Sequence, residues 1–474
     1  MNSRCAIKNI LLLALTIGLH AQQEPQLACS PFFRIFDQQT DQIKRDCLVN
    51  QENVSATATT RGQSDWLLLI YMAADNNLNY FAWHNIKQMA SAGSNKNITI
   101  VIQLNEPGAN KKTQCYLIEQ NKAVLLNQDQ VAAGKKFNTG DPQTLIDFCT
   151  EAITKFPASH IALVLWDHGT GYLDPFKVKL INPHELFQLN PSDMMLELNR
   201  NNDNLIGNLD RTGYLRGICF DETYHSYLSN QKVNYALHTI CQKIGRKFDI
   251  IGLDACMMQM LEFGCLLSPY ARYMVGSQEV ELGAGWNYKY ILTPFGEKSF
   301  SADEFAAHIV ACYQKTYSRI THDYTLSAVD LARLPALADS VNSTSNLLQN
   351  CLHNQLDKSV KTVLASCRAK GNCTCFDEPS YVDLGHLYKN ILSKVNLFSL
   401  STSTQIIDKL ISELQRGNQL LQAAVIANTT GKNLSNACGL SIYFPEKNMH
   451  ASYPKTPFAA NNNWNNFLTD YLSQ

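Results

Sequence analysis

The sequence predicts an α/β fold in which a mainly parallel sheet is flanked by helices, and three observations lead to it. Short apolar runs alternate with segments whose apolar residues recur at helical spacing. Residues 160–166 and 248–253 are largely apolar, as strands buried on both faces of a parallel sheet are. Strands and helices also follow one another in turn, which is typical of a sheet covered by helices on both faces.

The elements follow in order from about residue 65. The expected strands are residues 66–72, 98–104, 114–118 (as an edge strand), 160–166, 248–253 and 273–277. The expected helices are residues 74–90, 142–156, 232–246 and 257–267. Asp75 and Asp141 are the expected caps of the first two helices, because a carboxylate there accepts hydrogen bonds from free backbone N–H groups. Beyond residue 331 the chain is more helical, returns to a strand over 439–444 and ends in an aromatic-rich helix over 464–471.

The chain of 474 residues is too long for one typical core, which indicates several parts. We expect a signal peptide over residues 1–21, a linker or pro-segment over 22–64, the main α/β domain over 65–330 and a C-terminal extension over 331–474. Within the main domain, residues 173–213 interrupt the alternation with a polar stretch of little periodicity. Such a long stretch is expected to be an inserted loop that is functional or disordered.

The N-terminus has the pattern of a secretory signal peptide. Two basic residues, Arg4 and Lys8, precede an apolar stretch over 10–19 that is too short to span a bilayer, and residues 19–21 fit a cleavage site. The protein is therefore expected to be exported, to a periplasmic, cell-surface or secreted location, with no stable membrane span. A retained N-terminal anchor and a lipid attached to Cys29 are the alternatives.

Composition excludes several classes of protein. Charged residues make up 17% and hydrophobic residues 45%, which is typical of a globular chain and not of a disordered one. The net charge of −1 gives no electrostatic basis for binding nucleic acid or an anionic membrane. Neither a G-x-S-x-G sequence nor a phosphate-binding loop is present, so a serine hydrolase or a nucleotide-handling enzyme has no support.

Cysteine is abundant, with 15 residues in the chain. In an exported protein some of them are expected to form disulfides, above all among Cys367, Cys373 and Cys375, which share a loop-like segment. A zinc site is the alternative there, although no fourth ligand stands at a recognisable spacing. Cys149 and Cys265 fall in apolar helical runs and are expected to be buried thiols.

The most informative residues stand where two of the predicted strands end. The first strand leads into Asp167, His168 and Gly169, and the second into Asp254 and Cys256. In open α/β sheets, chemistry gathers at the carboxyl ends of the strands. A His and a Cys at two such ends are the base and the nucleophile that a thiol hydrolase needs.

Residues 166–169 (WDHG) and 254–257 (DACM) resemble the two catalytic motifs of the clostripain family of cysteine peptidases. Four further segments agree with the family in the same order: residues 66–77 (WLLLIYMAADNN), 324–331 (YTLSAVDL), 381–387 (YVDLGHL) and 439–445 (GLSIYFP). The resemblance covers the chain from about residue 66 to the C-terminus. It implies a caspase-like fold, with a mainly parallel sheet flanked by helices over 65–330 and a C-terminal α/β extension over 331–474.

The residues themselves suggest how such a site works. Cys256 would be the nucleophile, and a helix beginning at Met257 would lower its pKa. His168 would pair with the thiolate and protonate the leaving amine. The backbone N–H groups of Gly169 and Cys256 would form the oxyanion hole. Asp254 lies two positions before Cys256, on the same side of an extended strand, where it would pair with a cationic substrate side chain; a structural cap of the following helix is the alternative.

The resemblance adds expectations about specificity and regulation. Family members cleave after Arg or Lys, and the Asp at the position of Asp254 is linked to their specificity pocket. Residues 277–288 (SQEVELGAGWNY) resemble the loop that forms this pocket, with Gly285 and Trp286 in the expected places. Glu281 stands where Pro is common, and Ala284 where a polar or acidic residue is expected, which puts a strict Arg preference in doubt.

Family members are also processed between the His and Cys motifs. The insertion of this chain and its C-terminal flank hold Lys and Arg residues where such cuts would fall, namely Lys177, Lys179, Arg200, Arg211 and Arg216. Calcium dependence occurs in the family, but this chain has no D-x-D-x-D-G loop. No other cofactor and no metal site is expected.

The sequence therefore predicts an exported cysteine endopeptidase that cleaves peptide bonds after Arg or Lys with the dyad of Cys256 and His168. Its partners would be peptide or protein substrates with basic residues, and it would process itself between the two motifs. The alternative is a caspase-like scaffold kept for binding, in which peptidase activity is weak or lost.

Overall fold

The computed structural model describes residues 63–173, 186–199, 217–353, 359–398 and 403–473, together with Gln42, Ile43, Lys44 and Cys47. The chain divides into two compact units, residues 1–42 and 43–474, and every element named below belongs to the second. The expected signal peptide and most of the segment over 22–64 lie outside the described residues. Ile43 and Cys47 are buried, so this part of the expected linker contributes to the core of the second unit.

A nine-stranded sheet forms the centre of the fold, with the strand order β14-β12-β11-β10-β5-β1-β2-β3-β4. The strands from β11 to β2 are parallel to one another, and the pairs at both edges are antiparallel. The bounds are β1 (Ser64–Ala73), β2 (Ile98–Asn105), β3 (Gln114–Glu119), β4 (Lys122–Leu125), β5 (Ala158–Trp166), β10 (Phe248–Asp254), β11 (Ala271–Gly276), β12 (Thr325–Asp330) and β14 (Val425–Thr430). The sheet is therefore mainly parallel, as the sequence predicts.

Three two-stranded sheets accompany it in the described part of the chain. They pair β6 (Phe187–Leu189) with β7 (Leu196–Leu198), β8 (Ile218–Asp221) with β9 (Ser226–Leu228), and β13 (Tyr381–Asp383) with β15 (Ser441–Tyr443). The first pair falls inside the predicted insertion over 173–213. That insertion therefore contains a β-hairpin, although its sequence has little periodicity.

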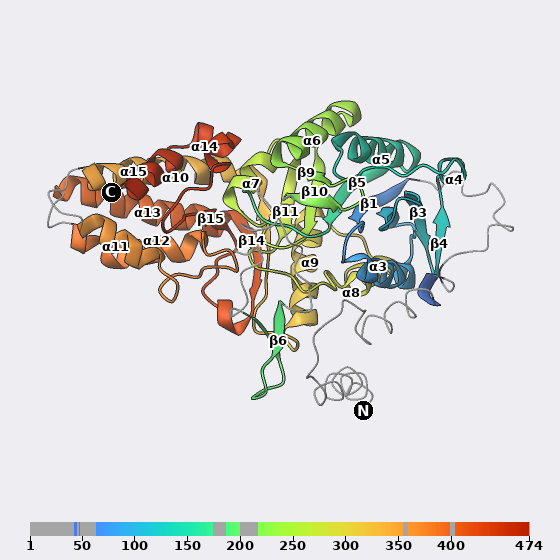
Figure 1. The fold of residues 1–474 in the computed structure, drawn as a ribbon, viewed down its shortest axis with the longest axis horizontal. Helices are drawn as coiled ribbons and strands as arrows, with labels where there is room; N and C mark the ends of the chain where they lie inside the picture. Colours follow the sequence, from blue (N-terminus) through green and yellow to red (C-terminus); the bar gives the residue numbers. More distant parts are fainter. Residues whose placement is uncertain are drawn as a thin grey trace. The chain divides into compact units, whose positions relative to one another are not determined.

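Helices cover both faces of the sheet (Figure 1). On one face lie α5 (Pro142–Lys155), α6 (Asn230–Ile244) and α7 (Leu261–Leu267), and on the other α3 (Asn79–Ala92), α8 (Tyr288–Leu292) and α9 (Ala302–Tyr317). The side chains of β1 alternate between them, because successive residues of a strand point to opposite faces. Leu67 and Leu69 pack with the first group, while Trp66 and Leu68 pack with the second. The short helix α4 (Gln128–Ala132) follows the edge strand β4.

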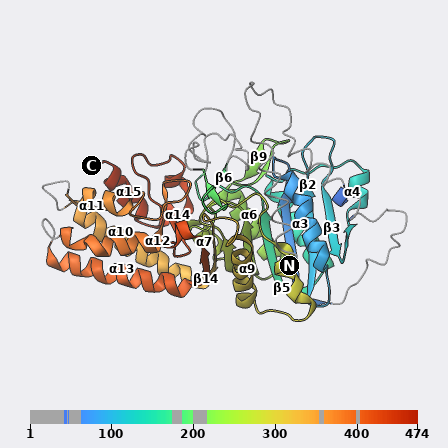
Figure 2. The same cartoon turned by 90° about the horizontal axis from the view of Figure 1, so that it is seen from below.

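The C-terminal part is mostly helical and continues the same core. Its helices are α10 (Leu334–His353), α11 (Ser359–Arg368), α12 (Leu384–Lys394), α13 (Thr404–Ala424), α14 (Pro457–Asn461) and α15 (Trp464–Ser473). Figure 2 shows α10, α12 and α13 stacked beside one another at one end of the sheet. Strand β14 follows α13 directly and pairs with β12, so the extension returns to the main sheet. Within the described ranges no helix combines the length and apolar character that a membrane span requires.

Several predicted elements are correct, and others are displaced. Helix α5 begins at Pro142, and Asp141 caps it by accepting a hydrogen bond from the Gln143 N–H at 2.9 Å. Asp75 does not cap the first helix, which begins later, at Asn79. Asp75 is instead buried in an ion pair with Lys136, with 2.7 Å between Oδ2 and Nζ. The strand predicted at the sheet edge, β3, lies one strand inside it, because β4 pairs with its outer side.

The expected disulfides at the Cys367 cluster are not formed. Cys367 and Cys373 are both buried free thiols. Cys149 is a buried free thiol in α5, as predicted, whereas Cys265 is a free thiol in α7 that is only partly buried.

Candidate active site

The site lies where β5 and β10 end side by side. These two strands are parallel neighbours, and their register pairs Trp166 with Asp254. The backbone N–H of Asp167 continues the ladder by donating to the Asp254 carbonyl at 3.2 Å. Because the strands end at the same level, the residues that follow them, His168 and Cys256, reach one edge of the sheet together.

Gly169 allows the two strand ends to approach closely. A Cβ atom at this position would lie 2.5 Å from the carbonyl oxygen of Cys256 and 3.0 Å from Cβ of Ala255. Any side chain would therefore push the two segments apart. The sequence predicted a role for the N–H of this glycine, and the structure adds that its lack of a side chain allows contact with the backbone of the candidate nucleophile.

Cys256 and His168 line one small cavity, together with Asp254, the pocket-loop residues Glu281 and Gly285, and neighbouring residues that include Leu186. Its volume of about 30 Å³ gives room for a water molecule or two and not for an amino-acid side chain. The site is therefore closed in this structure.

The environment of Cys256 differs from the expected one. The side chain is buried, and its Sγ accepts a hydrogen bond from the Glu281 N–H at 3.3 Å. Burial raises the pKa of the thiol far above its ordinary value, and nearby carboxyl groups add to the shift. Helix α7 begins only at Leu261, and Met257 has a positive φ of 58°. The prediction of a helix starting at Met257 that lowers the pKa of Cys256 is therefore wrong for this closed form.

His168 is held by a partner that the sequence did not predict. Its Nε2 lies 2.6 Å from Oδ1 of Asn77, in a hydrogen bond. Burial lowers the pKa of His168 to about 4, so the imidazole is neutral near pH 7. In this closed form both members of the expected dyad are uncharged.

Asp167, the residue before His168, anchors the turn. Its Oδ1 accepts a hydrogen bond from Nδ2 of Asn76 at 2.7 Å, and its Oδ2 accepts one from the backbone N–H of Phe220 in β8. Burial nevertheless raises the pKa of this carboxyl well above its usual value. The turn that carries His168 is thus fixed by the segment after β1 and by β8.

Asp254 forms one wall of the cavity. Its Oδ1 accepts from the Trp286 N–H at 3.1 Å and its Oδ2 from the Tyr288 hydroxyl at 2.7 Å. Burial raises its pKa to about 7, although these hydrogen bonds act in the opposite direction. A Cβ at Gly285 would lie 2.6 Å from Oδ1. Asp254 is therefore bound to the loop over 277–288 and does not cap α7.

Glu281 is a second buried carboxyl in the same cavity. Its side chain is 6% exposed, and neither carboxyl oxygen has a partner with hydrogen-bond geometry. Burial, and then the charge of Asp254, raise its pKa well above the ordinary value. Nε1 of Trp286 and the hydroxyl of Tyr313 are likewise buried without a hydrogen-bond partner. These polar groups lie close together, and Trp286 and Tyr313 act against burial on the pKa of Glu281.

Gly285 and Trp286 both contact Asp254, and sequence reasoning missed four other residues of the site. Asn77 and Tyr288 are the last residues of segments quoted for the family resemblance, so a signal for them was present. Glu281 was noted only as a departure from the family pattern. Leu186 belongs to the insertion and gave no signal, since only the tertiary structure brings it to the cavity.

Comparison with known proteins now settles the family. The model of the clostripain family of C11 peptidases matches residues 70–182 and 205–471. The chain belongs to the clostripain family. It is a cysteine protease of that family, as the motifs around His168 and Cys256 predicted. No curated protein sequence matches the chain.

Solved structures of clostripain-family proteins share its caspase-like fold. A secreted C11 cysteine protease from Bacteroides thetaiotaomicron, in complex with an irreversible peptide inhibitor, is 17% identical with a TM-score of 0.53, and the match covers 85% of this chain and 99% of that one. An inactive zymogen C11 protease from Parabacteroides distasonis is 17% identical with a TM-score of 0.52, and the match covers 86% of this chain and 99% of that one. A second structure of a secreted Bacteroides thetaiotaomicron C11 protease gives 15% identity and a TM-score of 0.55, and the match covers 85% of this chain and 100% of that one.

Proposed function

We propose that this clostripain-family protein is an endopeptidase that cleaves after Arg and Lys, with Cys256 as nucleophile and His168 as general acid and base. One observation carries the proposal. The cavity that contains both residues is also lined by two buried carboxyl groups, those of Asp254 and Glu281. A buried carboxyl is costly unless a cation or hydrogen bonds compensate it, and two adjacent ones are costlier still.

A basic substrate side chain would compensate the two carboxyl groups. A guanidinium group has donors for several oxygens at once and remains charged in a buried site. Neither oxygen of Glu281 has a partner with hydrogen-bond geometry, although Trp286 and Tyr313 lie near it, whereas the oxygens of Asp254 are already hydrogen-bonded to the loop. Glu281 therefore supplies the acidic character that Ala284 lacks, and it becomes the main determinant of basic specificity.

The reaction follows from the two strand ends. His168 takes the proton of the Cys256 thiol, and the sulfur attacks the carbonyl carbon of the residue that precedes the scissile bond. The oxyanion accepts hydrogen bonds from the N–H groups of Gly169 and Cys256. His168 then gives its proton to the leaving amine, and a thioester remains. Water, deprotonated by His168, attacks the thioester and restores the thiol.

The closed cavity supports activation by self-processing. Leu186, from the insertion over 173–213, lines the cavity in which the substrate side chain would bind. A cut in this insertion would free Leu186 to leave, and water entering the opened site would reverse the effects of burial on the pKa values of Cys256 and His168. Lys177, Lys179, Arg200, Arg211 and Arg216, at which such a cut is expected, lie outside the described residues.

The signal-like N-terminus supports a role on extracellular or periplasmic proteins. The basic and apolar pattern of residues 1–21 is that of a secretory signal, and these residues lie outside the described part of the chain. We propose that the mature peptidase acts on peptides or proteins with accessible basic residues in the periplasm, at the cell surface or outside the cell.

Matched fluorogenic peptides that differ only in the residue before the cut test the specificity. The parent enzyme should hydrolyse peptides with Arg or Lys at this position at least about 100-fold faster, in kcat/KM, than peptides with Gln or Leu, because a neutral side chain leaves the carboxyls uncompensated. Glu281→Gln and Asp254→Asn should each lower kcat/KM for the basic peptides alone.

Glu262→Gln is the matched control, since Glu262 is also fully buried with a pKa raised to about 7 by burial but lies outside the cavity. It should leave the preference unchanged. A parent enzyme without basic preference would reject the specificity, and a folded parent without any Cys256-dependent hydrolysis would favour the binding scaffold instead.

A further inference from the structure

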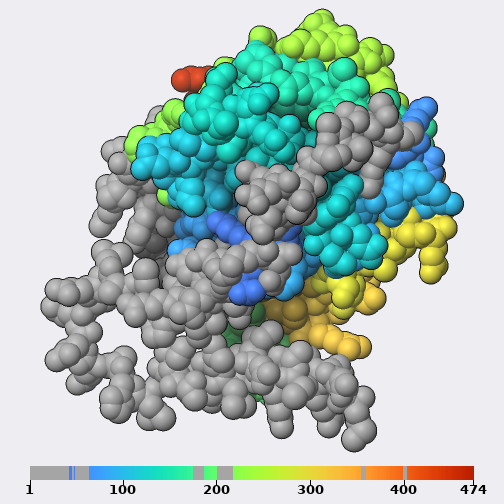
Figure 3. Space-filling view, turned by 90° about the vertical axis from the view of Figure 1, so that its right-hand side faces the viewer, coloured from blue at the N-terminus to red at the C-terminus, as the bar shows by residue number. Residues whose placement is uncertain are grey.

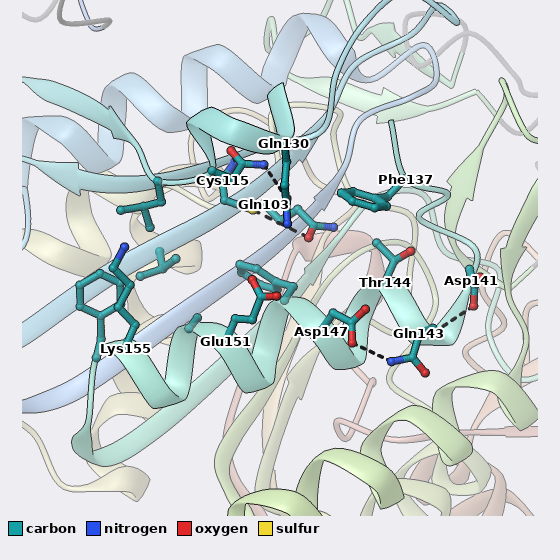
Figure 4. A pocket seen from close by; sticks show the side chains of 16 residues that line it. Gln103, Cys115, Gln130, Phe137, Asp141, Gln143, Thr144, Asp147, Glu151 and Lys155 are labelled. Atoms are coloured by element: carbon teal, nitrogen blue, oxygen red, sulfur yellow. Dashed lines mark hydrogen bonds between the residues drawn. The ribbon is translucent and has the colours of Figure 1, made fainter. Parts of the chain in front are cut away.

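A second cavity lies away from the candidate active site, between the sheet and α5. Its volume is about 360 Å³, and Figure 4 shows the side chains around it. The walls come from β2 and β3 on one side, from α5 on the other, and from the segment around α4. The end of the molecule formed by β3, β4 and α4 faces the viewer in Figure 3. A cavity of this volume matches the lower range of sites that bind small organic ligands.

The floor of the cavity is apolar and largely aromatic. Phe148 and Phe156 are buried on the side of α5, and Phe137 lies at the opposite wall, half-buried. Val101 and Leu126 add aliphatic surface. A flat or branched apolar group would find contacts on three sides here, and burying it would favour binding.

Gln103 adds an unsatisfied polar group to this floor. It is 4% exposed, and its Oε1 lies 4.0 Å from the Cys115 thiol, which donates weakly to it. Its Nε2 has no hydrogen-bond partner. In Figure 4 the amide reaches from β2 toward the space above α5. Buried donors without partners are rare and costly, so a ligand that offers an acceptor at this place would gain the missing hydrogen bond.

The rim of the cavity is acidic. Asp141, Asp147 and Glu151 stand along the exposed side of α5, and Lys155 at its end is the one basic residue among the described residues that line the cavity. Asp141 is engaged in capping the helix, and Asp147 accepts from the Gln143 side chain at 2.6 Å. Glu151 lies between Asp147 and Lys155 on the same face of α5. Burial raises the pKa of the Cys115 thiol, and Glu151 is near enough to raise it further. The rim therefore attracts cations and repels anions.

We propose that this cavity binds the free α-amino end of a peptide whose first side chain is aromatic or apolar. The ammonium group would lie at Asp147 and Glu151, the side chain on the phenylalanine floor, and the first carbonyl oxygen would accept from Nε2 of Gln103. These three groups occur together, a few bonds apart, at such a peptide end. An anion would be repelled by the rim, and a purely apolar molecule would leave the Gln103 donor unpaired.

This assignment concerns a site separate from the catalytic one and does not depend on which bonds the peptidase cuts. Every peptide-bond hydrolysis by an endopeptidase produces a new α-amino end, so ligands of this class are formed wherever the enzyme works. The cavity would thus hold a product end, or the N-terminal end of a substrate, at a distance from Cys256.

Four small probes test the assignment by ligand-observed NMR titration of the full-length Cys256→Ala protein, in which no turnover occurs. Phenylalaninamide carries all three groups and should bind with a dissociation constant on the order of 1 mM, as expected for a ligand of its size. N-Acetylphenylalaninamide lacks the charge, phenethylamine lacks the carbonyl, and glycinamide lacks the ring. Each should bind at least about 3-fold more weakly.

Two substitutions locate the site. Gln103→Leu keeps the volume of the side chain and removes the donor. It should weaken the binding of phenylalaninamide about 5-fold and leave the binding of phenethylamine unchanged. Glu151→Gln removes an exposed charge. It should weaken the binding of phenylalaninamide and of phenethylamine about 2- to 5-fold, but not the binding of N-acetylphenylalaninamide. Asp129→Asn is the control, because Asp129 is an exposed acid of α4 outside the lining.

Equal binding of phenylalaninamide and its acetylated form would overturn the proposal, as would unchanged binding in Glu151→Gln. If Gln103→Leu fails to fold, the Glu151→Gln comparison still decides the outcome, since an exposed substitution leaves the core intact. Weakening by Asp129→Asn as large as that by Glu151→Gln would indicate general charge attraction and would also reject the site.

Discussion

The backbone N–H of Glu281 donates a hydrogen bond to Sγ of Cys256 at 3.3 Å, while the side chain of the same residue lies buried beside Asp254. One residue of the pocket loop thus holds the candidate nucleophile and supplies one of the two carboxyls of the candidate specificity pocket. Any movement of the loop that opens the pocket must also release the thiol. Substrate binding and activation of Cys256 are therefore expected to occur together.

Replacing Cys256 with Ala should lower peptide hydrolysis by several orders of magnitude, because the covalent route is lost. The free energy of unfolding should change by only about 1 kcal/mol, since one sulfur and its weak hydrogen bond are removed. Hydrolysis rates and chemical denaturation measure the two effects. Cys265→Ala, in α7 and outside the cavity, is the control and should keep full activity. Substantial activity in Cys256→Ala would contradict the mechanism.

Preference for basic residues should depend on pH through the ionisation of Asp254. Burial raises its pKa to about 7, so below that pH the carboxyl is protonated and attracts a cation poorly. The ratio of kcat/KM for matched Arg and Gln peptides should rise as pH increases through about 7. The pKa of Glu281 is raised as well, so its ionisation should add to the rise. Ionisation of Cys256 and His168 affects the hydrolysis of both peptides equally, so its effect cancels in the ratio. In Asp254→Asn the rise should be smaller; a ratio that is flat in the parent enzyme would oppose this assignment.

The same raised pKa predicts how stability depends on pH. Below about pH 4 the carboxyl of Asp254 is protonated in the folded and the unfolded state, and its contribution to stability is fully present. As pH rises toward 7, the unfolded state loses this proton first, so the free energy of unfolding falls; above 7 the fall stops. Denaturant unfolding of the parent and of Asp254→Asn between pH 4 and 8 should show a smaller fall in the variant. Parallel curves would mean that Asp254 ionises normally.

Self-processing should produce two fragments that stay associated. Active protein should have a new N-terminus between residues 178 and 217, while Cys256→Ala should remain one chain on a denaturing gel. The fragments should elute together in size-exclusion chromatography, because the cut lies between β5 and β10, which pair in one sheet. N-terminal sequencing identifies the bond. A single intact chain with full activity would reject the idea.

Gly285 should tolerate no side chain. Its φ is 59°, and a Cβ would lie 2.6 Å from Oδ1 of Asp254. Gly285→Ala should therefore destabilise the fold by more than the roughly 1 kcal/mol that a left-handed backbone alone costs, and it should lower kcat/KM for Arg peptides. Gly245→Ala is the matched control, with a φ of 70° but nothing within 4 Å of the added Cβ. Equal losses of stability in the two variants would show that the contact with Asp254 is unimportant.

The sequence alone determined the fold class and the two strand ends. Strands β5 and β10 could be predicted because a strand buried on both faces must be apolar along its length. Such an apolar run can be recognised in the sequence without any knowledge of its neighbours. The cap of α5 by Asp141 is equally local, since it depends on residues that adjoin in sequence. The family motifs then identified His168 and Cys256.

Tertiary structure decided what surrounds these residues. The pKa values of Cys256 and His168 depend on burial, which is set by contacts with Glu281, Asn77 and other residues far away in the sequence. Glu281 appeared in the sequence only as a departure from a pattern, and Leu186 as part of an aperiodic insertion. Their places at the cavity result from how the loop and the insertion fold back onto the sheet. Long-range packing of this kind leaves no periodic signal in the chain, because no single segment determines it.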